Sequence, residues 1–119
     1  VRTFEEEYEV APGVVARRTG GHTPGHCMVR VASGGERLTF VGDAIFQVGF
    51  DQPGWYNGFE HDPEESARVR TDLLQEFAET REPFVASHLP FPSLDILRLE
   101  GRITAAGDAF RAVPAVWDY

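Results

Sequence analysis

The chain has 119 residues, of which 42% are hydrophobic and 25% are charged. This length and composition are typical of one soluble globular domain that folds without disulfides or a structural metal. The single cysteine, Cys27, excludes a disulfide-stapled scaffold and a four-cysteine zinc site. With 11 basic and 19 acidic residues the net charge is −8, which argues against nucleic acid and anionic membrane surfaces as partners.

The sequence disfavours both membrane insertion and export. No apolar run approaches the about 20 residues that a membrane-spanning helix needs. The N-terminus is acidic, whereas a signal peptide begins with a basic segment followed by an apolar one. We therefore expect a cytoplasmic protein. Because the chain begins with Val1 rather than methionine, we also expect a processed or excised piece of a longer protein.

The first half of the chain favours β-structure. Short β-prone segments lie between residues 8 and 18. Residues 27–32 alternate well enough for a strand, and a Gly-rich turn at 33–36 leads into the apolar segment 38–41, so a β-hairpin is predicted. Residues 42–58 are rich in glycine and aromatic residues without a clear period. There we expect an extended loop with room for one helical turn.

A helix is predicted over residues 63–80. Asp62 precedes Pro63 and two glutamates, an arrangement typical of a helix N-terminus. Val69, Leu73 and Phe77 recur every four residues and give the helix one apolar face. This face is expected to pack against a sheet.

After the helix, residues 84–86 predict a short buried strand. Residues 95–100 and 102–105, separated by Gly101, predict a second hairpin, and the tail 106–119 has no clear pattern. One helix covers only one face of a sheet, so we expect the other face to be apolar and uncovered. The strand residues that exceed what one helix can bury are Val29, Val31, Leu38, Phe40, Val85 and Ile96.

Three of the four histidines lie at turns or strand ends. His22 and His26 flank a Thr-Pro-Gly turn just before a strand, and His88 follows the strand 84–86. Asp43 comes at the end of another strand. Because strand ends converge along one edge of a sheet, we expect His22, Asp43 and His88 to meet there. Imidazoles combined with a carboxylate suit zinc, and a carboxylate can bridge two zinc ions.

Three motifs in the sequence resemble those of the metallo-β-lactamase-fold hydrolases. They are Gly21-His22-Thr23-Pro24-Gly25-His26, then Val41-Gly42-Asp43-Ala44, then Ser87-His88-Leu89-Pro90-Phe91-Pro92. The resemblance covers residues 8–105 and is greatest to the branch that contains lactonases and organophosphate hydrolases. It implies that residues 1–119 form one α+β domain, the C-terminal half of a four-layer αβ/βα sandwich. Such a half has a mixed, largely antiparallel sheet with a helix on one face.

The resemblance also implies a role for each motif residue. His22 would bind one zinc ion, His88 would bind the second, and Asp43 would bridge both. His26 would hold the turn or a neighbouring ligand by a hydrogen bond, with a purely structural role as the alternative. In this family the metals activate a bridging water and polarise the scissile carbonyl or phosphoryl oxygen.

The chain departs from the family pattern at two points. The family's other metal ligands come from an H-x-H-x-D-H motif in its N-terminal half, and this sequence contains no such run. A dinuclear site cannot be completed within one copy of the chain, so we expect the chain alone to be inactive. The family usually has Thr-Pro-Gly before the histidine pair, where this chain has Thr19-Gly20-Gly21.

Other residues have weaker functional interpretations. Aromatic residues that could line a substrate pocket, with core packing as the alternative, are Phe46, Phe50, Trp55, Tyr56 and Phe91. Cys27, in an apolar strand, is expected to be a small buried hydrophobe. His61, just before the helix cap, is expected to be exposed.

Two functions from different classes follow. The first is part of a zinc-dependent hydrolase of esters, lactones or phosphotriesters, with two zinc ions in the complete site and a small-molecule substrate. The second is a non-catalytic module that keeps the scaffold for self-association or partner binding. The uncovered sheet face predicts a partner, either the missing N-terminal half of the parent or a second copy of this chain. We expect a homodimer.

Overall fold

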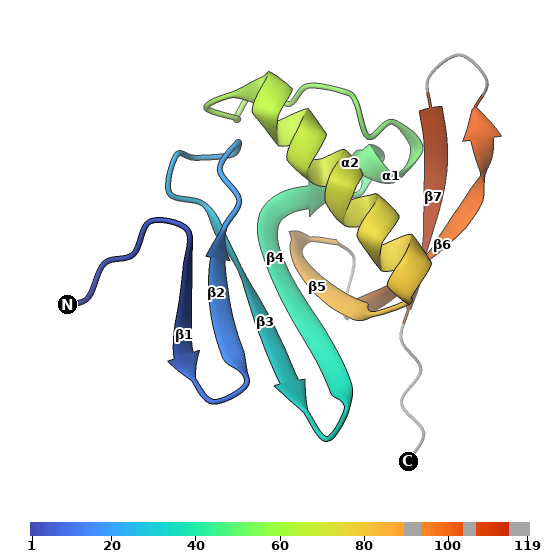
Figure 1. Ribbon diagram of the computed structural model, residues 1–119. Coiled ribbons are helices and arrows are strands. Elements are labelled where there is room, and N and C mark those ends of the chain that lie inside the picture. Colours follow the sequence, from blue (N-terminus) through green and yellow to red (C-terminus); the bar gives the residue numbers. More distant parts are fainter. Residues whose placement is uncertain (90–93, 104–106, 115–119) are drawn as a thin grey trace.

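The computed structural model describes residues 1–89, 94–103 and 107–114 (Figure 1). Within them, one sheet holds seven strands in chain order, and every neighbouring pair is antiparallel except β4 and β5, which are parallel. The predicted mixed, largely antiparallel sheet with a helix on one face is therefore confirmed. The strands are β1 (Glu7–Ala11), β2 (Val14–Arg18), β3 (Cys27–Ser33), β4 (Glu36–Phe46), β5 (Pro83–His88), β6 (Leu94–Ile103) and β7 (Gly107–Pro114). The helices are α1 (Val48–Asp51) and α2 (Pro63–Thr80).

The predicted hairpin over residues 27–41 is confirmed as β3 and β4. Val29 pairs with Phe40 and Val31 pairs with Leu38, across a turn that contains two glycines with positive φ. The β-prone segment 8–18 forms a second hairpin, β1 and β2, which extends the sheet on the side of β3.

The prediction of a loop over residues 42–58 is wrong for its first part. β4 continues to Phe46, and only then does the short helix α1 follow. The strand passes through Gly42, whose φ is +56°, and its register with β5 shifts on both sides of this glycine. A bend of this kind breaks the alternation of side chains without ending the strand, which is why the sequence pattern is lost there. The helical turn, in contrast, is present as α1.

The prediction of a hairpin turn at Gly101 is also wrong. β6 runs without interruption from Leu94 to Ile103, and Gly101 is the site of a register shift against β7. Glycine in a strand often marks such a bulge rather than a turn. The strand that pairs with β6 comes from the tail, where Phe110 of β7 is buried in the core.

Helix α2 follows its predicted bounds. Its cap, Asp62, accepts the backbone N–H of Glu65 at 2.9 Å, and its C-terminus closes at Arg81, which has a left-handed φ of 58°. Phe77 is fully buried and stacks on Phe84 of β5, with ring centroids 4.9 Å apart. The core therefore lies between α2 and the face of the sheet that this helix covers.

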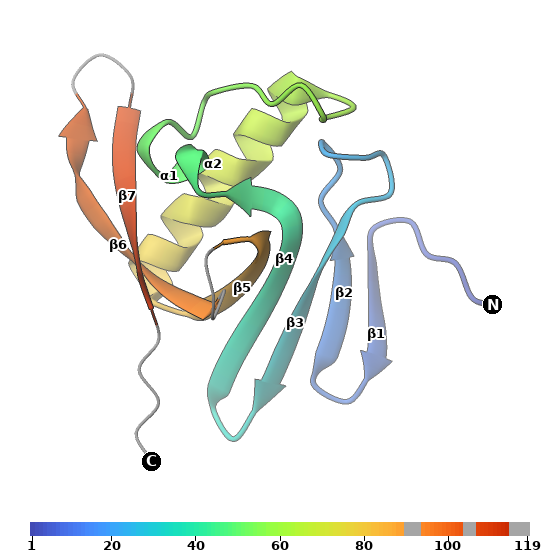
Figure 2. The same cartoon turned by 180° about the vertical axis from the view of Figure 1, so that it is seen from behind.

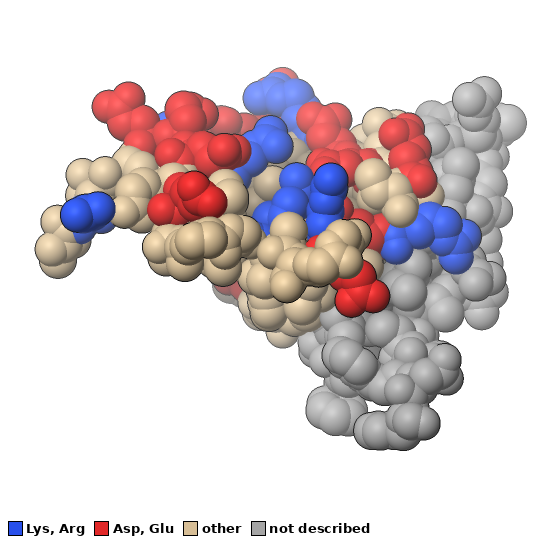
Figure 3. All heavy atoms as spheres, turned by 60° about the horizontal axis from the view of Figure 1, so that its bottom comes forward, with Lys and Arg blue, Asp and Glu red and all other residues tan. Residues whose placement is uncertain are grey.

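The opposite face of the sheet is apolar and lacks a helix among the described residues (Figure 2). Ala16, Val29, Phe40 and Val85 pair in one row across β2, β3, β4 and β5, and Phe40 is 42% exposed. In Figure 3, which brings the bottom of Figure 1 forward, acidic and basic side chains gather along the upper part of the view, on the side that carries α2. The prediction of an uncovered face holds for the described strand residues, while the side chain of Ile96 lies outside them.

Strand direction gives the sheet one edge where several chain segments converge. β3 is antiparallel to both β2 and β4, and β5 is parallel to β4, so β2, β4 and β5 all run the same way. Their C-terminal ends therefore lie along one edge. Among the described residues, no helix is both long and apolar enough to cross a membrane.

Candidate metal centre

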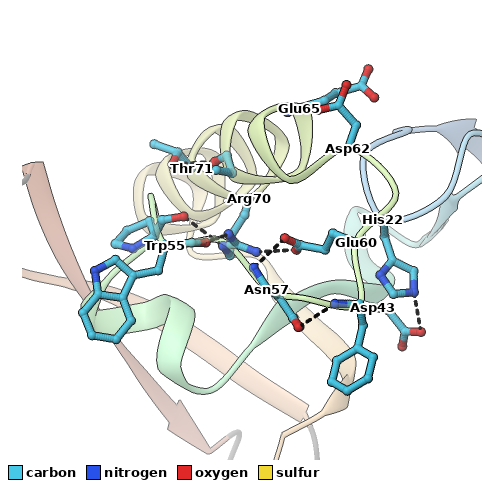
Figure 4. Close-up of polar contacts among 12 residues, drawn as sticks. His22, Asp43, Trp55, Asn57, Glu60, Asp62, Glu65, Arg70 and Thr71 are labelled. Atoms are coloured by element: carbon cyan, nitrogen blue, oxygen red, sulfur yellow. Dashed lines mark hydrogen bonds and ion pairs between the residues drawn. The ribbon is translucent and has the colours of Figure 1, made fainter.

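His22, Asp43 and His88 lie together at this edge of the sheet. Nε2 of His22 is 3.2 Å from Oδ2 of Asp43, and Nε2 of His88 is 3.2 Å from Oδ1 of the same carboxylate. Figure 4 shows the imidazole of His22 pointing at Asp43. The side chain of His88 is 63% exposed, so the cluster is open to solvent on that side.

Each of the three residues reaches the edge by a different local feature. His22 lies in the turn between β2 and β3, and His88 is the last residue of β5. Asp43 lies within β4 rather than at its end, directly after the bend at Gly42. A Cβ on residue 42 would lie 3.0 Å from Nε2 of His26. Glycine therefore permits both the bend and the close approach of that imidazole.

His26 lies beside the cluster, but both of its ring nitrogens have other partners. Its Nε2 accepts the backbone N–H of Asp43 at 3.3 Å, and its Nδ1 is hydrogen-bonded to the hydroxyl of Thr19. Burial lowers the pKa of His26 below its usual value, and the nearby His22 lowers it further, while Asp43 acts in the opposite direction. A neutral ring is what the acceptor role of Nε2 requires. This imidazole therefore fixes the main chain of Asp43 rather than facing a metal.

The donor atoms fit a carboxylate that bridges two metal ions. Because each imidazole meets a different oxygen of Asp43, two ions at this cluster would each take one nitrogen and one oxygen from the chain. In the part of the chain that the structure describes, no three His, Cys, Asp or Glu side chains are grouped to hold one ion. The donor types suit zinc, but zinc sites have four ligands or three and a water, so each half-site needs further ligands.

A buried arginine holds the segment between β4 and α2. Arg70 of α2 has a fully buried side chain, and its guanidinium is 2.9 Å from the equally buried carboxylate of Glu60. The same guanidinium donates to the carbonyl oxygen of Trp55 (Figure 4). It also donates to the carbonyl oxygen of Pro53 and lies 4.4 Å from the ring centroid of Phe46. This one side chain therefore ties together the segment that runs from the end of β4 to the start of α2.

The segment held by Arg70 leads directly to the turn that carries His22. Asn57 donates its backbone N–H to Glu60 at 2.9 Å. The next residue after Glu60, His61, donates its backbone N–H to the carbonyl oxygen of His22 at 3.0 Å. His61 itself is exposed, as predicted. The buried ion pair is thus linked to one of the three clustered residues through a single main-chain hydrogen bond.

The aromatic pocket candidates occupy different environments. Phe50 is 7% exposed and packs near Phe84 in the core, and Phe46 lies under Arg70. Trp55 and Tyr56 are exposed, while Phe91 lies outside the described residues. The sequence analysis did not single out Phe59, which is 88% exposed and lies two residues before His61.

The sequence analysis also missed Arg70 and Glu60. The signal for Arg70 was its position three residues after Ala67 and four before Leu74, which places it on the buried face of the helix. No local pattern marks Glu60, whose burial depends on where the segment before α2 folds. Cys27, expected to be buried, is only partly so, and its thiol contacts the carbonyl oxygen of Gly25 at 3.3 Å.

Comparisons with known proteins agree with one another. The family model described as the metallo-beta-lactamase superfamily matches residues 2–88. Among solved structures, AidC, a dizinc quorum-quenching lactonase in complex with a product, is 26% identical, with a TM-score of 0.79 over 94% of this chain and 37% of that chain. The hydrolase AbOPH of the beta-lactamase superfamily is 27% identical, with a TM-score of 0.79 over 93% of this chain and 37% of that chain.

A probable metal-dependent hydrolase from Staphylococcus aureus is 26% identical, with a TM-score of 0.64 over 71% of this chain and 31% of that chain. The comparison with curated proteins found no match. The chain therefore spans less than two fifths of the length of the similar structures, and its sheet and helix correspond to half of an αβ/βα sandwich.

Replacing Arg70 tests the importance of the buried ion pair. Arg70→Met keeps much of the apolar volume but leaves the carboxylate of Glu60 buried without its charge partner. We expect the free energy of unfolding, measured by urea denaturation, to fall by about 3–5 kcal/mol. Arg68→Met removes an exposed ion pair from the same helix, and this control should change the value by less than about 0.5 kcal/mol.

The double variant Arg70→Met/Glu60→Gln removes the stranded charge and keeps an acceptor for Asn57. It should be more stable than Arg70→Met alone, because no charged group then remains buried without a partner. If the double variant were no more stable than the single one, the loss would come from packing rather than from the unpaired carboxylate.

Proposed function

This chain belongs to the metallo-beta-lactamase superfamily, and from that membership we propose that it supplies zinc ligands to a hydrolase of esters, lactones or phosphotriesters. The observation that carries the proposal is the position of Asp43 between two imidazoles, each at a separate carboxylate oxygen. A simple ion pair needs only one histidine. A carboxylate with an imidazole nitrogen at each oxygen is suited to two metal ions.

In the proposed site, His22 and His88 would each hold one ion, and the carboxylate of Asp43, which lies between them, would be shared by both. His26 stays neutral and holds the main chain of Asp43, so that the bridging carboxylate keeps its place. When bound, the metal pair activates a water and polarises the oxygen of the bond that is cleaved.

The substrate class is proposed from the similar structures. One of them is a lactonase with its product, and another is a hydrolase of the beta-lactamase superfamily. The exposed aromatic side chains of Trp55, Tyr56 and Phe59 lie on the segment that leads to His61 and the His22 turn. A small molecule with both an apolar part and an ester, lactone or phosphotriester group would suit this combination. A cytoplasmic location completes the proposal.

Zinc binding tests the site directly. We expect the folded chain to bind up to two zinc ions, weakly, as measured by equilibrium dialysis with metal analysis. Asp43→Ala should abolish the binding of both ions because Asp43 contributes to each, whereas His88→Ala should remove one. Asp51→Ala removes an exposed carboxylate from α1 and should leave zinc binding unchanged. Zinc binding that survives Asp43→Ala would contradict the proposed site.

We expect the 119-residue chain by itself to show no hydrolase turnover. Each ion would receive only one nitrogen and one oxygen from this chain, too few ligands to hold a metal and orient a water for attack. The measurement is hydrolysis of a lactone and of an aryl phosphotriester by the purified, zinc-loaded chain. Substantial turnover that Asp43→Ala abolishes would show that the chain completes an active site without further ligands.

A second function is favoured by the uncovered face of the sheet. Val29, Phe40 and Val85 form an apolar row without a helix over it among the described residues. Such a face supports the alternative of a non-catalytic module that associates with itself or with a partner. A folded chain that binds no zinc would favour this alternative over the hydrolase.

The same face leads us to expect a homodimer. Burial of apolar surface favours association by about 25 cal/mol per Å², before the cost of association itself. Phe40→Arg should shift the mass measured by light scattering toward the monomer, because it places a charge in the expected interface. Val48→Arg changes an exposed apolar residue in α1 and serves as the control. A wild-type chain that remains monomeric at high micromolar concentration would overturn this expectation.

A further inference from the structure

We propose that Glu65, in the first turn of α2, is the positioning residue for His22, an inference that rests on the proposed metal centre. Glu65 acts on the main chain that precedes His22 rather than on its imidazole. Its carboxylate accepts the backbone N–H of Gly21 at 2.9 Å. The carbonyl oxygen of Gly21 in turn accepts the backbone N–H of Asp62 at 3.0 Å.

These two hydrogen bonds place Gly21 inside the cap of the helix. In an ordinary capping box, the glutamate three residues after the cap accepts the backbone N–H of the cap residue itself. Here Asp62 still accepts the N–H of Glu65, but the N–H of Asp62 goes to Gly21 and the carboxylate of Glu65 takes the N–H of Gly21. The capping box is opened, and the peptide groups of Gly21 are inserted between its two halves.

The main chain of His22 is fixed by the same helix end. Its carbonyl oxygen accepts the N–H of His61 at 3.0 Å, and its own N–H donates to Gly20 at 3.0 Å. The N–H and carbonyl groups of Gly21 and the carbonyl of His22 are thus all bonded to residues 61–65. Within the described parts of the chain, no such link to α2 is seen for Asp43 or His88, which β4 and β5 carry. Glu65 therefore positions His22 and leaves Asp43 and His88 to their strands.

Glycine at positions 20 and 21 makes this close contact possible. Gly21 has a φ of +74°, and a Cβ there would lie 2.7 Å from Cα of Ser66. Gly20 has a φ of +71°, and its Cβ would lie 3.0 Å from the carboxylate oxygens of Glu65. Side chains at either position would push the turn away from the helix. Gly20, which stands where the family has proline, and Gly21 thus leave room for the carboxylate of Glu65 beside the turn.

The first experiment measures zinc affinity at equilibrium by competition with a chelating dye. Glu65→Ala should weaken one of the two zinc ions, the one held by His22, by about 10–100-fold, the usual effect of removing a group that orients a ligand. Glu65→Gln keeps an acceptor oxygen and should restore the affinity to within about threefold of wild type. Glu64→Ala removes an acid from the same helical turn whose carboxylate pairs with Arg68, and it should leave the affinity unchanged.

The second experiment uses the chain without metal, so that it does not depend on the proposed function. Long-range ¹H–¹⁵N spectra at fixed pH report which ring nitrogen carries the proton. In the wild type, both His22 and His88 should carry it on Nε2, facing Asp43. Glu65→Ala should shift the His22 signals toward those of a free imidazole and leave those of His88 in place. Gly21→Ala should have the same effect through the clash with Ser66.

The outcomes separate the two proposals. If the wild type binds no zinc but Glu65→Ala changes only the His22 signals, the metal site fails and the positioning role stands. If Glu65→Ala leaves the zinc affinity unchanged, as Glu64→Ala should, and also leaves the His22 signals in place, the positioning role is overturned. A Glu65→Gln variant as weak as Glu65→Ala would also overturn it, because the effect would then come from the negative charge and not from the hydrogen bond.

Discussion

The fully buried pair of Arg70 and Glu60 is the interaction on which the arrangement around the candidate site depends. Two charges without exposure to water are tolerated only when their hydrogen-bonding groups find partners, and here carbonyl oxygens of Pro53 and Trp55 and the N–H of Asn57 provide them. The arginine anchors a segment in which the large apolar side chains of Trp55, Tyr56 and Phe59 are exposed rather than packed in the core. The segment reaches the His22 turn in a fixed conformation because this cation holds it.

The candidate site joins two parts of the fold that are stabilised in different ways. Asp43 and His88 belong to β4 and β5, the one parallel pair in the described sheet, whose crossover contains α2. Parallel strands joined by a helix place their C-terminal ends at the same edge, so these two residues meet through topology alone. His22 comes from the connection between β2 and β3 in the other, antiparallel part. Its position depends on main-chain hydrogen bonds to residues 61–65 rather than on strand pairing.

The two faces of the sheet have different partners in the described structure. Met28, Val41 and Phe84 are buried beneath α2 in one continuous core, whereas Phe40 on the opposite face remains 42% exposed. The similar structures are much longer than this chain, and the sheet corresponds to half of their αβ/βα sandwich. An apolar face without a helix is therefore consistent with a half-sandwich that packs on another layer.

The sequence by itself determined the elements whose signals are local. Asp62-Pro63 set the start of α2, the alternation around the Gly34-Gly35 turn set the β3–β4 hairpin, and the motif order indicated which histidines and which aspartate would converge. These features depend on periodicity, capping and turn geometry, all of which act over a few residues. Where the local signal was ambiguous, at Gly42 and Gly101, the sequence indicated an end of a strand although the strand continues.

Only the tertiary structure decided how the distant segments are joined. Three features show this: the ion pair of Arg70 and Glu60, the insertion of Gly21 into the cap of α2, and the pairing of the tail as β7. No short sequence pattern indicates any of these contacts. The partner of a buried charge, of a capping group or of an edge strand depends on which segment the fold brings within hydrogen-bonding distance. That choice is made by packing across the whole chain, so it cannot be read from the residues on either side.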